Sequence, residues 1–344
     1  MSSGGPAGRY VTGERVGGAG HRTGDWLGAV DVGGTHLRTA LAGPDGRLSA
    51  RARVRIRPHD EISQVADAIR ALVAGHQVAR VIVGMPGRID RRTGRLEQAR
   101  NLPITWIAGL NAAVLSEQAG CEVVLAGDAE LAVIGEAWFG AGTRTGDTAY
   151  LTLSTGVGFA ATSQGRLLAG HRVGFQLGFI RPDGPGQPLL DSLASGQQLA
   201  ALARATGRDE LTIQQLLELA DAGDPRARQT WERIVRYGAW AALAVCHAVN
   251  PDVLVIGGGL TAAGDRLLQP LAEAVQAELA AGSGLAVEIR RSALGDDAAL
   301  AGAGAFAAAT AALPGAVPSA ATPSATALAR TAVPGTALSG TAPA

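Results

Sequence analysis

The stretch Gly28-Ala-Val-Asp-Val-Gly-Gly-Thr-His-Leu-Arg-Thr-Ala-Leu41 joins a short apolar run to alternating apolar residues through a pair of glycines. This pattern predicts a β-hairpin made of a strand, a tight turn and a returning strand. Gly33 and Gly34 tolerate positive φ and let backbone N–H groups approach an anion closely. Asp31 is placed to hold a hydrated Mg²⁺ against the same anion, and Thr35 adds a hydroxyl. Taken alone, the stretch also fits an ordinary hairpin with a glycine turn.

The composition of the chain sets its broad class. With 344 residues, the chain is long enough for one large or two medium domains with a buried core. Its 30 basic and 30 acidic residues cancel, which argues against nucleic acid or an anionic membrane as a partner. Every basic residue is an arginine, so the chain has no lysine for a P-loop or for a Schiff base.

The cysteines and the two ends of the chain carry no chemistry. Cys121 and Cys246 lie far apart and form no CxxC motif, which argues against a disulfide framework and a cysteine-rich zinc site. Residues 1–25 lack the apolar core of a signal peptide, and residues 314–344 are almost wholly Ala, Pro, Thr, Ser and Gly. We predict that both segments are disordered. No apolar run is long enough for a membrane-spanning helix, so we predict a cytoplasmic protein.

Between these ends, apolar strands that stop at glycine loops alternate with helices. Strands are expected over residues 78–83, 122–125, 149–153 and 253–256, and helices over 61–74, 129–138, 225–249 and from 260 onward. This alternation predicts an α/β protein whose ligands bind beyond the strand ends. No strand is followed by the glycine fingerprint of a dinucleotide-binding fold.

Two further glycine loops and one aspartate follow these strands. The loop Ser154-Thr-Gly-Val-Gly158 offers backbone donors and hydroxyls suited to phosphates. The loop Gly257-Gly-Gly259 has no side chains, so its backbone could lie alongside an adenosine. Asp128 follows a strand and precedes a helix, where a carboxylate could accept the proton of an attacking hydroxyl. The alternative for Asp128 is a helix N-cap, and the two roles are compatible.

Taken together, these motifs resemble the ROK family (repressors, open reading frames and kinases), within the superfamily of sugar kinases, heat-shock-70 proteins and actin. The resemblance runs from about residue 26 to 313. The residues that carry it are Asp31-Val-Gly-Gly-Thr35, Gly84-Met-Pro-Gly87, Asn101-Leu-Pro103, Gly127-Asp-Ala129, Ser154-Thr-Gly-Val-Gly158, Ser195-Gly196, Asn250-Pro251, Gly257-Gly-Gly259 and Leu294-Gly-Asp-Asp-Ala298.

The resemblance implies a glucokinase-like sugar kinase that uses ATP and Mg²⁺, with Asp128 as general base. Its fold would be two ribonuclease-H-like (actin-like ATPase) domains around a central cleft, over residues 26–128 and 129–297, with a terminal helix over 298–313 that returns to the first domain. The implied ATP-binding residues are Asp31 (with Mg²⁺ through water), Gly33, Gly34, Thr35, Ser154, Thr155, Gly156, Gly158, Gly257, Gly258 and Gly259. A homodimer is also implied.

The part that recognises the sugar departs from the family pattern. The Asn residues that usually flank the catalytic Asp are Gly127 and Glu130 here. The usual Glu-x-Gly-His, which contacts the sugar, is Gln176-Leu-Gly-Phe179. Residues 181–188 hold no cysteine, so we expect no structural zinc. Asn101, Gln176 and Asp191 are the sugar-binding residues that the resemblance implies.

These departures leave more than one function open. The first is phosphorylation of a hexose or N-acetylhexosamine. The second is an inactive sugar- or nucleotide-binding sensor, and the third is ATP hydrolysis without transfer. Residues 1–25 are too few and too rich in glycine for the helix-turn-helix of the family's repressors. His36 and His171 are weaker candidates for contacts with phosphate and sugar.

Overall fold

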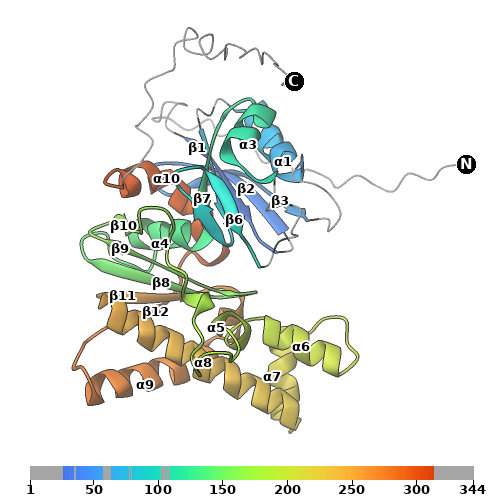
Figure 1. Ribbon diagram of the computed structural model, residues 1–344, viewed down its shortest axis with the longest axis vertical. Helices are drawn as coiled ribbons and strands as arrows, with labels where there is room; N and C mark the ends of the chain where they lie inside the picture. The colour runs from blue at the N-terminus through green and yellow to red at the C-terminus, as the bar shows by residue number, and fades with distance from the viewer. Residues whose placement is uncertain are drawn as a thin grey trace, which may run out of the picture.

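The computed structural model describes residues 26–34, 36–56, 63–76, 78, 80–100, 102, 106 and 109–313. The leader and the tail that we predict to be disordered lie outside these residues. The described elements form two sheets with helices around and between them (Figure 1). Within the described part of the chain, no helix is long and apolar enough to cross a membrane.

The first sheet has the strand order β3-β2-β1-β4-β7. Its strands are β1 (Leu27–Val32), β2 (His36–Ala42), β3 (Leu48–Arg55), β4 (Arg80–Met85) and β7 (Glu122–Gly127). The predicted hairpin is present as β1 and β2, which run antiparallel, while β1, β4 and β7 run parallel. A small separate hairpin, β5 (Arg88–Asp90) and β6 (Arg95–Gln98), follows β4.

The second sheet repeats this topology, with the order β10-β9-β8-β11-β12. Its strands are β8 (Asp147–Leu153), β9 (Val157–Ser163), β10 (Arg166–Leu168), β11 (Val253–Gly257) and β12 (Glu288–Arg291). Again the first three strands are antiparallel and the last two extend the sheet in parallel. Two sheets of one topology confirm the predicted α/β fold with two ribonuclease-H-like units.

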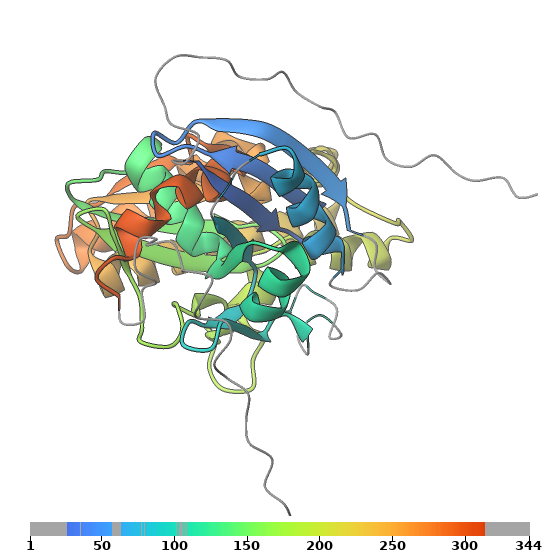
Figure 2. The ribbon, with the colours of Figure 1, turned by 90° about the horizontal axis from the view of Figure 1, so that it is seen from above.

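Helices cover both faces of the first sheet. On one face, α1 (Ser63–Ala74) and α3 (Ala112–Ala119) bury apolar side chains against β1, β4 and β7. On the other face lies α10 (Ala298–Thr310), whose alanines pack on β1 and β2 (Figure 2). The segment at the C-terminal end of the described fold therefore packs on its first hairpin.

A close helix pair joins the two sheets. Helix α4 (Asp128–Phe139) contacts α10 as well as β8 and β9 of the second sheet. A Cβ on Gly302 of α10 would lie 1.9 Å from the Leu131 carbonyl oxygen, and one on Gly135 would lie 2.2 Å from that of Ala298. The absence of side chains at these glycines is therefore what lets the two helix backbones touch.

The other face of the second sheet is covered by the helices of the C-terminal half. These are α5 (Leu190–Leu193), α6 (Gln197–Ala205), α7 (Ile213–Asp221), α8 (Pro225–Val249) and α9 (Asp265–Ala281). The limits of α8 match the prediction, because Asp224 caps its first N–H groups and Asn250 ends it in the left-handed conformation.

The helix expected from Leu260 onward was wrong in detail. A 3₁₀ turn, η3 (Gly259–Ala263), comes first, and α9 begins only at Asp265. Gly264 has φ of 60°, which breaks any continuous helix between the two elements. The remaining short turns are η2 (Leu177–Phe179) and η4 (Gly295–Asp297).

Candidate active site

A cavity of about 490 Å³ lies where the turns that follow β1, β7, β8 and β11 converge. The predicted site residues that line it are Asp31, Gly33, Gly34, Asp128, Ser154, Thr155, Gly156, Gly158, Gln176, Asp191, Gly258 and Gly259. Gly257 does not line it. This glycine ends β11, where a Cβ would lie 2.0 Å from the Tyr150 hydroxyl, so its place is set by packing. Thr35 and Asn101 lie outside the described residues.

Asp128 begins α4 at the carboxyl end of β7. Its Oδ1 accepts a hydrogen bond from the Ala129 N–H at 2.7 Å. Gly127, in an extended conformation, is the N-cap of α4. Asp128 is therefore the first residue of the helix and not its N-cap, which is the alternative role considered from the sequence. Burial and then the negative charge of Asp31 raise the pKa of Asp128 to about 7. A carboxyl group with such a pKa can accept a proton near neutral pH.

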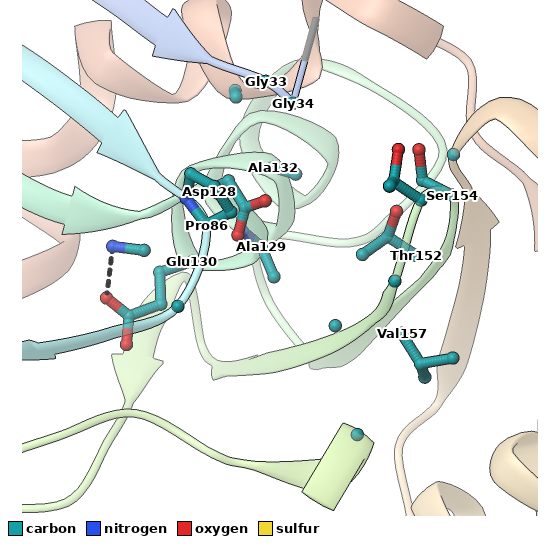
Figure 3. A pocket seen from close by; sticks show the side chains of 18 of the residues that line it. Gly33, Gly34, Pro86, Asp128, Ala129, Glu130, Ala132, Thr152, Ser154 and Val157 are labelled. Atoms are coloured by element: carbon teal, nitrogen blue, oxygen red, sulfur yellow. Dashed lines mark hydrogen bonds between the residues drawn. The ribbon is translucent and has the colours of Figure 1, made fainter. Parts of the chain in front are cut away.

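Figure 3 shows the surroundings of this carboxylate. In that view, the side chain of Glu130 lies on one side of Asp128, and the hydroxyls of Thr152 and Ser154 lie on the other. Glu130 is buried, accepts a hydrogen bond from the Gly127 N–H at 3.1 Å and pairs with Arg91. The charge of Glu130 also raises the pKa of Asp128, by less than burial does.

Asp31 sits at the end of β1, directly opposite Arg38 of β2. The Arg38 guanidinium donates to Asp31 Oδ2 from Nη2 at 2.5 Å and from Nε at 3.1 Å. Arg38 Nη1 also lies 3.2 Å from Oδ2 of Asp296, in the segment that precedes α10. Burial raises the pKa of Asp31, and the charge of Arg38 opposes that effect. The hairpin thus presents a buried carboxyl group with one oxygen held by arginine.

The two glycine loops of the second sheet touch each other. The β8–β9 turn is closed by a hydrogen bond of 2.9 Å from the Ser154 N–H to the Gly156 carbonyl. Gly258 has φ of 89°, and a Cβ there would lie 2.5 Å from the Leu153 carbonyl oxygen. Only glycine fits this contact without strain, because the conformation and the space both exclude a side chain.

Two of the residues expected to bind sugar, Gln176 and Asp191, line the side of the cavity next to the start of β9. Asp191 is buried, and its two oxygens accept from the Val157 N–H at 2.7 Å and from Gln197 Nε2 at 2.9 Å. The Gln176 amide donates to the Phe175 carbonyl at 3.0 Å. Phe179 is 37% exposed, and the Arg100 guanidinium lies 5.9 Å from its ring centroid. This side of the cavity therefore combines amide, carboxylate and aromatic groups.

The two histidines differ in position. His36 lines the cavity, where burial and then Arg53 lower its pKa. His171 is exposed and is not among the described residues that line the cavity. No group of three or more metal-ligating side chains occurs among the described residues.

The model of the ROK family matches residues 27–310. The chain belongs to the ROK family. The resemblance noted in the sequence is thereby confirmed.

Several relatives in this family are known enzymes. The glucokinase of Thermotoga maritima is 30% identical over 272 residues, which cover 72% of this chain and 86% of that protein. A ROK family glucokinase from Streptomyces griseus, solved in complex with glucose and AMPPNP, is 26% identical with a TM-score of 0.68, over 82% of this chain and 98% of that chain. The ROK hexokinase from Thermus thermophilus is 29% identical with a TM-score of 0.67, over 81% and 96%.

Some residues of this ROK-family site were not selected from the sequence. Arg38 could have been, because the turn of a hairpin fixes which residues face each other across it. Phe159 and Phe175 both line the cavity, with ring centroids 4.8 Å apart. Asp296 also lines the cavity, although it comes from a segment far along the chain. No local pattern marks Phe159 or Phe175, whereas Asp296 lies in the stretch Leu294–Ala298 that carries part of the family resemblance.

Proposed function

We propose that this ROK-family protein is an ATP-dependent sugar kinase in which Asp128 is the general base. The observation that carries the proposal is that Asp128 lines one cavity together with the glycine loops and with Gln176 and Asp191. Its pKa of about 7 allows the ionised form to take a proton from a sugar hydroxyl near neutral pH. Relatives named glucokinase and beta-glucoside kinase support a sugar as the acceptor.

The residues of the cavity fit the nucleotide. The glycine turns at Gly33–Gly34 and at 154–158 leave room for phosphate oxygens beside backbone N–H groups, and Ser154 and Thr155 add hydroxyl donors. Gly258 and Gly259 leave bare backbone for the adenosine. Both Arg38 bonds reach Oδ2 of Asp31, which leaves Oδ1 for a water bound to Mg²⁺. When bound, Mg-ATP supplies the phosphoryl group to be transferred.

The protein's own part in the reaction is positioning and proton transfer. Asp128 orients the acceptor hydroxyl and takes its proton as the new O–P bond forms. The loops and Asp31 keep the phosphates in line with that hydroxyl. Gln176, Asn101 and Asp191 are the proposed contacts for the other hydroxyls of a hexose or an N-acetylhexosamine. Because Asp191 already accepts two hydrogen bonds, we assign it mainly the support of the β9 end.

The test is release of ADP from Mg-ATP in the presence of a panel of hexoses and N-acetylhexosamines. Turnover with one sugar that falls about 10²–10⁴-fold in Asp128→Asn would support both the activity and the base. Turnover that Asp128→Asn leaves unchanged would contradict the role of Asp128. ADP release without any sugar would indicate an ATPase.

A second candidate is a sensor that binds sugar or nucleotide without transfer. It is favoured by the acceptor side, where Phe179 offers no hydrogen bond and Glu130 is paired with Arg91. Calorimetry with the same sugars separates the two functions. A sugar that binds but supports no ADP release at saturating Mg-ATP would favour the sensor.

A further inference from the structure

Two arginines connect the β5–β6 hairpin with the segment that precedes Gln176, one of the residues expected to bind sugar. Arg172, in the segment after β10, donates to Oδ2 of Asp90 from Nη2 at 2.6 Å and from Nε at 3.1 Å. Its Nη2 also lies 3.1 Å from Oε1 of Glu97, on the second strand of the hairpin. Asp90 is only 1% exposed, so its carboxylate depends on this partner for charge compensation.

The second arginine, Arg91, belongs to the hairpin and donates to the segment, whereas Arg172 belongs to the segment and donates to the hairpin. Arg91, beside Asp90 in the hairpin, pairs with Glu130 of α4 and donates from Nη1 to the Gly170 carbonyl at 3.2 Å. Its backbone N–H also donates to the Arg172 carbonyl at 2.8 Å. Gly174 packs directly on this pair, since a Cβ there would lie 2.2 Å from Oε1 of Glu130. We call Asp90, Arg91, Glu130 and Arg172 the clamp.

The clamp holds a short segment whose next residues line the cavity. Gly170 and Arg172 are hydrogen-bonded to the hairpin, and Gly174, Phe175, Gln176 and Phe179 follow along the cavity wall. The segment therefore enters the cavity from a point that the β5–β6 hairpin fixes, although it belongs to the connection that leaves β10 of the second sheet. Neither Arg172 nor Asp90 lines the cavity. Arg172 can therefore affect sugar binding only indirectly, and the segment in which it lies leads directly to Gln176.

We propose that Arg172 is a positioning residue for the acceptor, which acts by pairing with Asp90 and Glu97 and so fixes Gln176 at the cavity wall. This proposal rests on the proposed kinase function. The side chain of Arg172 is 56% exposed, so its removal leaves no cavity in the core, and Arg172→Lys keeps a positive charge beside the buried Asp90. Without Arg172, we expect the segment to be more mobile in the free protein. Sugar binding would then have to order it, which weakens the affinity for the sugar.

The test compares Arg172→Gln with Arg172→Lys and with a matched control, Arg266→Gln. Arg266 also makes two hydrogen bonds to a carboxylate, each of 2.7 Å, although Asp221 is exposed, and neither residue lines the cavity. We expect Arg172→Gln to raise the sugar KM about tenfold while kcat and the ATP KM stay within about twofold of wild type. Arg172→Lys, which keeps the charge but not the planar fork, should fall between. Arg266→Gln should match the wild type.

A double variant and a measurement without substrate complete the test. Adding Asp90→Asn to Arg172→Gln should raise the sugar KM no further, because the pair is already lost. In hydrogen exchange, the amides of residues 173–180 should exchange faster in Arg172→Gln and not in Arg266→Gln. An unchanged sugar KM with unchanged exchange would overturn the clamp's role. If the wild type phosphorylates no sugar, the kinase function fails, and exchange in these amides still decides whether Arg172 fixes the segment.

Discussion

The titration of Asp128 gives the most direct test of the proposed chemistry. Its pKa is raised to about 7 by burial, by Asp31 and by Glu130, and only the ionised form can accept the proton of the sugar. About nine tenths of this group is ionised at pH 8 and about one tenth at pH 6, for a pKa near 7. We therefore expect kcat/KM for the sugar to fall roughly tenfold between pH 8 and pH 6.

The same pKa predicts an effect on stability with a definite sign. The folded-state pKa lies above the ordinary value of 3.8, so the folded protein retains a proton that the unfolded chain loses between pH 3.8 and about 7. Stability therefore decreases as the pH rises through this range. The full difference corresponds to at most about 4 kcal/mol above pH 7. Asp128→Asn, which cannot ionise, should thus be more stable than the wild type at pH 8 and equal to it below pH 4.

The assay is steady-state ADP release from pH 5.5 to 9 at saturating Mg-ATP, together with urea unfolding of wild type and Asp128→Asn at pH 4 and pH 8. Because the sugar hydroxyl does not ionise in this range, the acid limb of kcat/KM reports a group of the enzyme. A constant kcat/KM between pH 6 and 8 would refute the reasoning. So would an Asp128→Asn variant that is less stable than the wild type at pH 8.

Three further variants probe the framework of the site, and each is measured by urea unfolding. Gly258→Ala must place a Cβ at positive φ, 2.5 Å from the Leu153 carbonyl oxygen. We therefore expect the free energy of unfolding to fall by about 2 kcal/mol and the ATP KM to rise. An unchanged ATP KM would contradict the role of this loop in nucleotide binding. Glu136→Gln replaces the buried carboxylate that accepts hydrogen bonds from the N–H groups of Ala141, Ala293 and Leu294. We expect the free energy of unfolding to fall by about 3 kcal/mol. Gly302→Ala should push α4 and α10 apart and lower the free energy of unfolding by about 3 kcal/mol. A free energy of unfolding equal to that of the wild type would show that the two helices can move apart without loss of stability. Finally, we expect a zinc chelator to leave the Tm unchanged, because residues 181–188, where the family's zinc loop would lie, contain no cysteine.

Local sequence determined several elements of this protein down to their ends. The hairpin at 28–41 follows from alternation with period two and from a glycine turn, which need no distant residue. Both ends of α8 follow from Asp224, Pro225 and Asn250, because caps act on the nearest backbone groups. The helix expected from Leu260 failed because the pattern did not reveal that Gly264 takes a left-handed conformation.

The tertiary structure alone decided the chemistry of the groups that these elements bring together. The packing of Gly257 beneath Tyr150 and the pairing of Asp90 with Arg172 join residues far apart in the chain. The pKa of Asp128 depends on how much water the whole fold excludes and on the distance to Asp31, which comes from another strand. Periodicity and caps are properties of neighbours in sequence, whereas desolvation and charge pairing are properties of neighbours in space. For this reason the sequence could name Asp128, while only the packed fold could set its affinity for a proton.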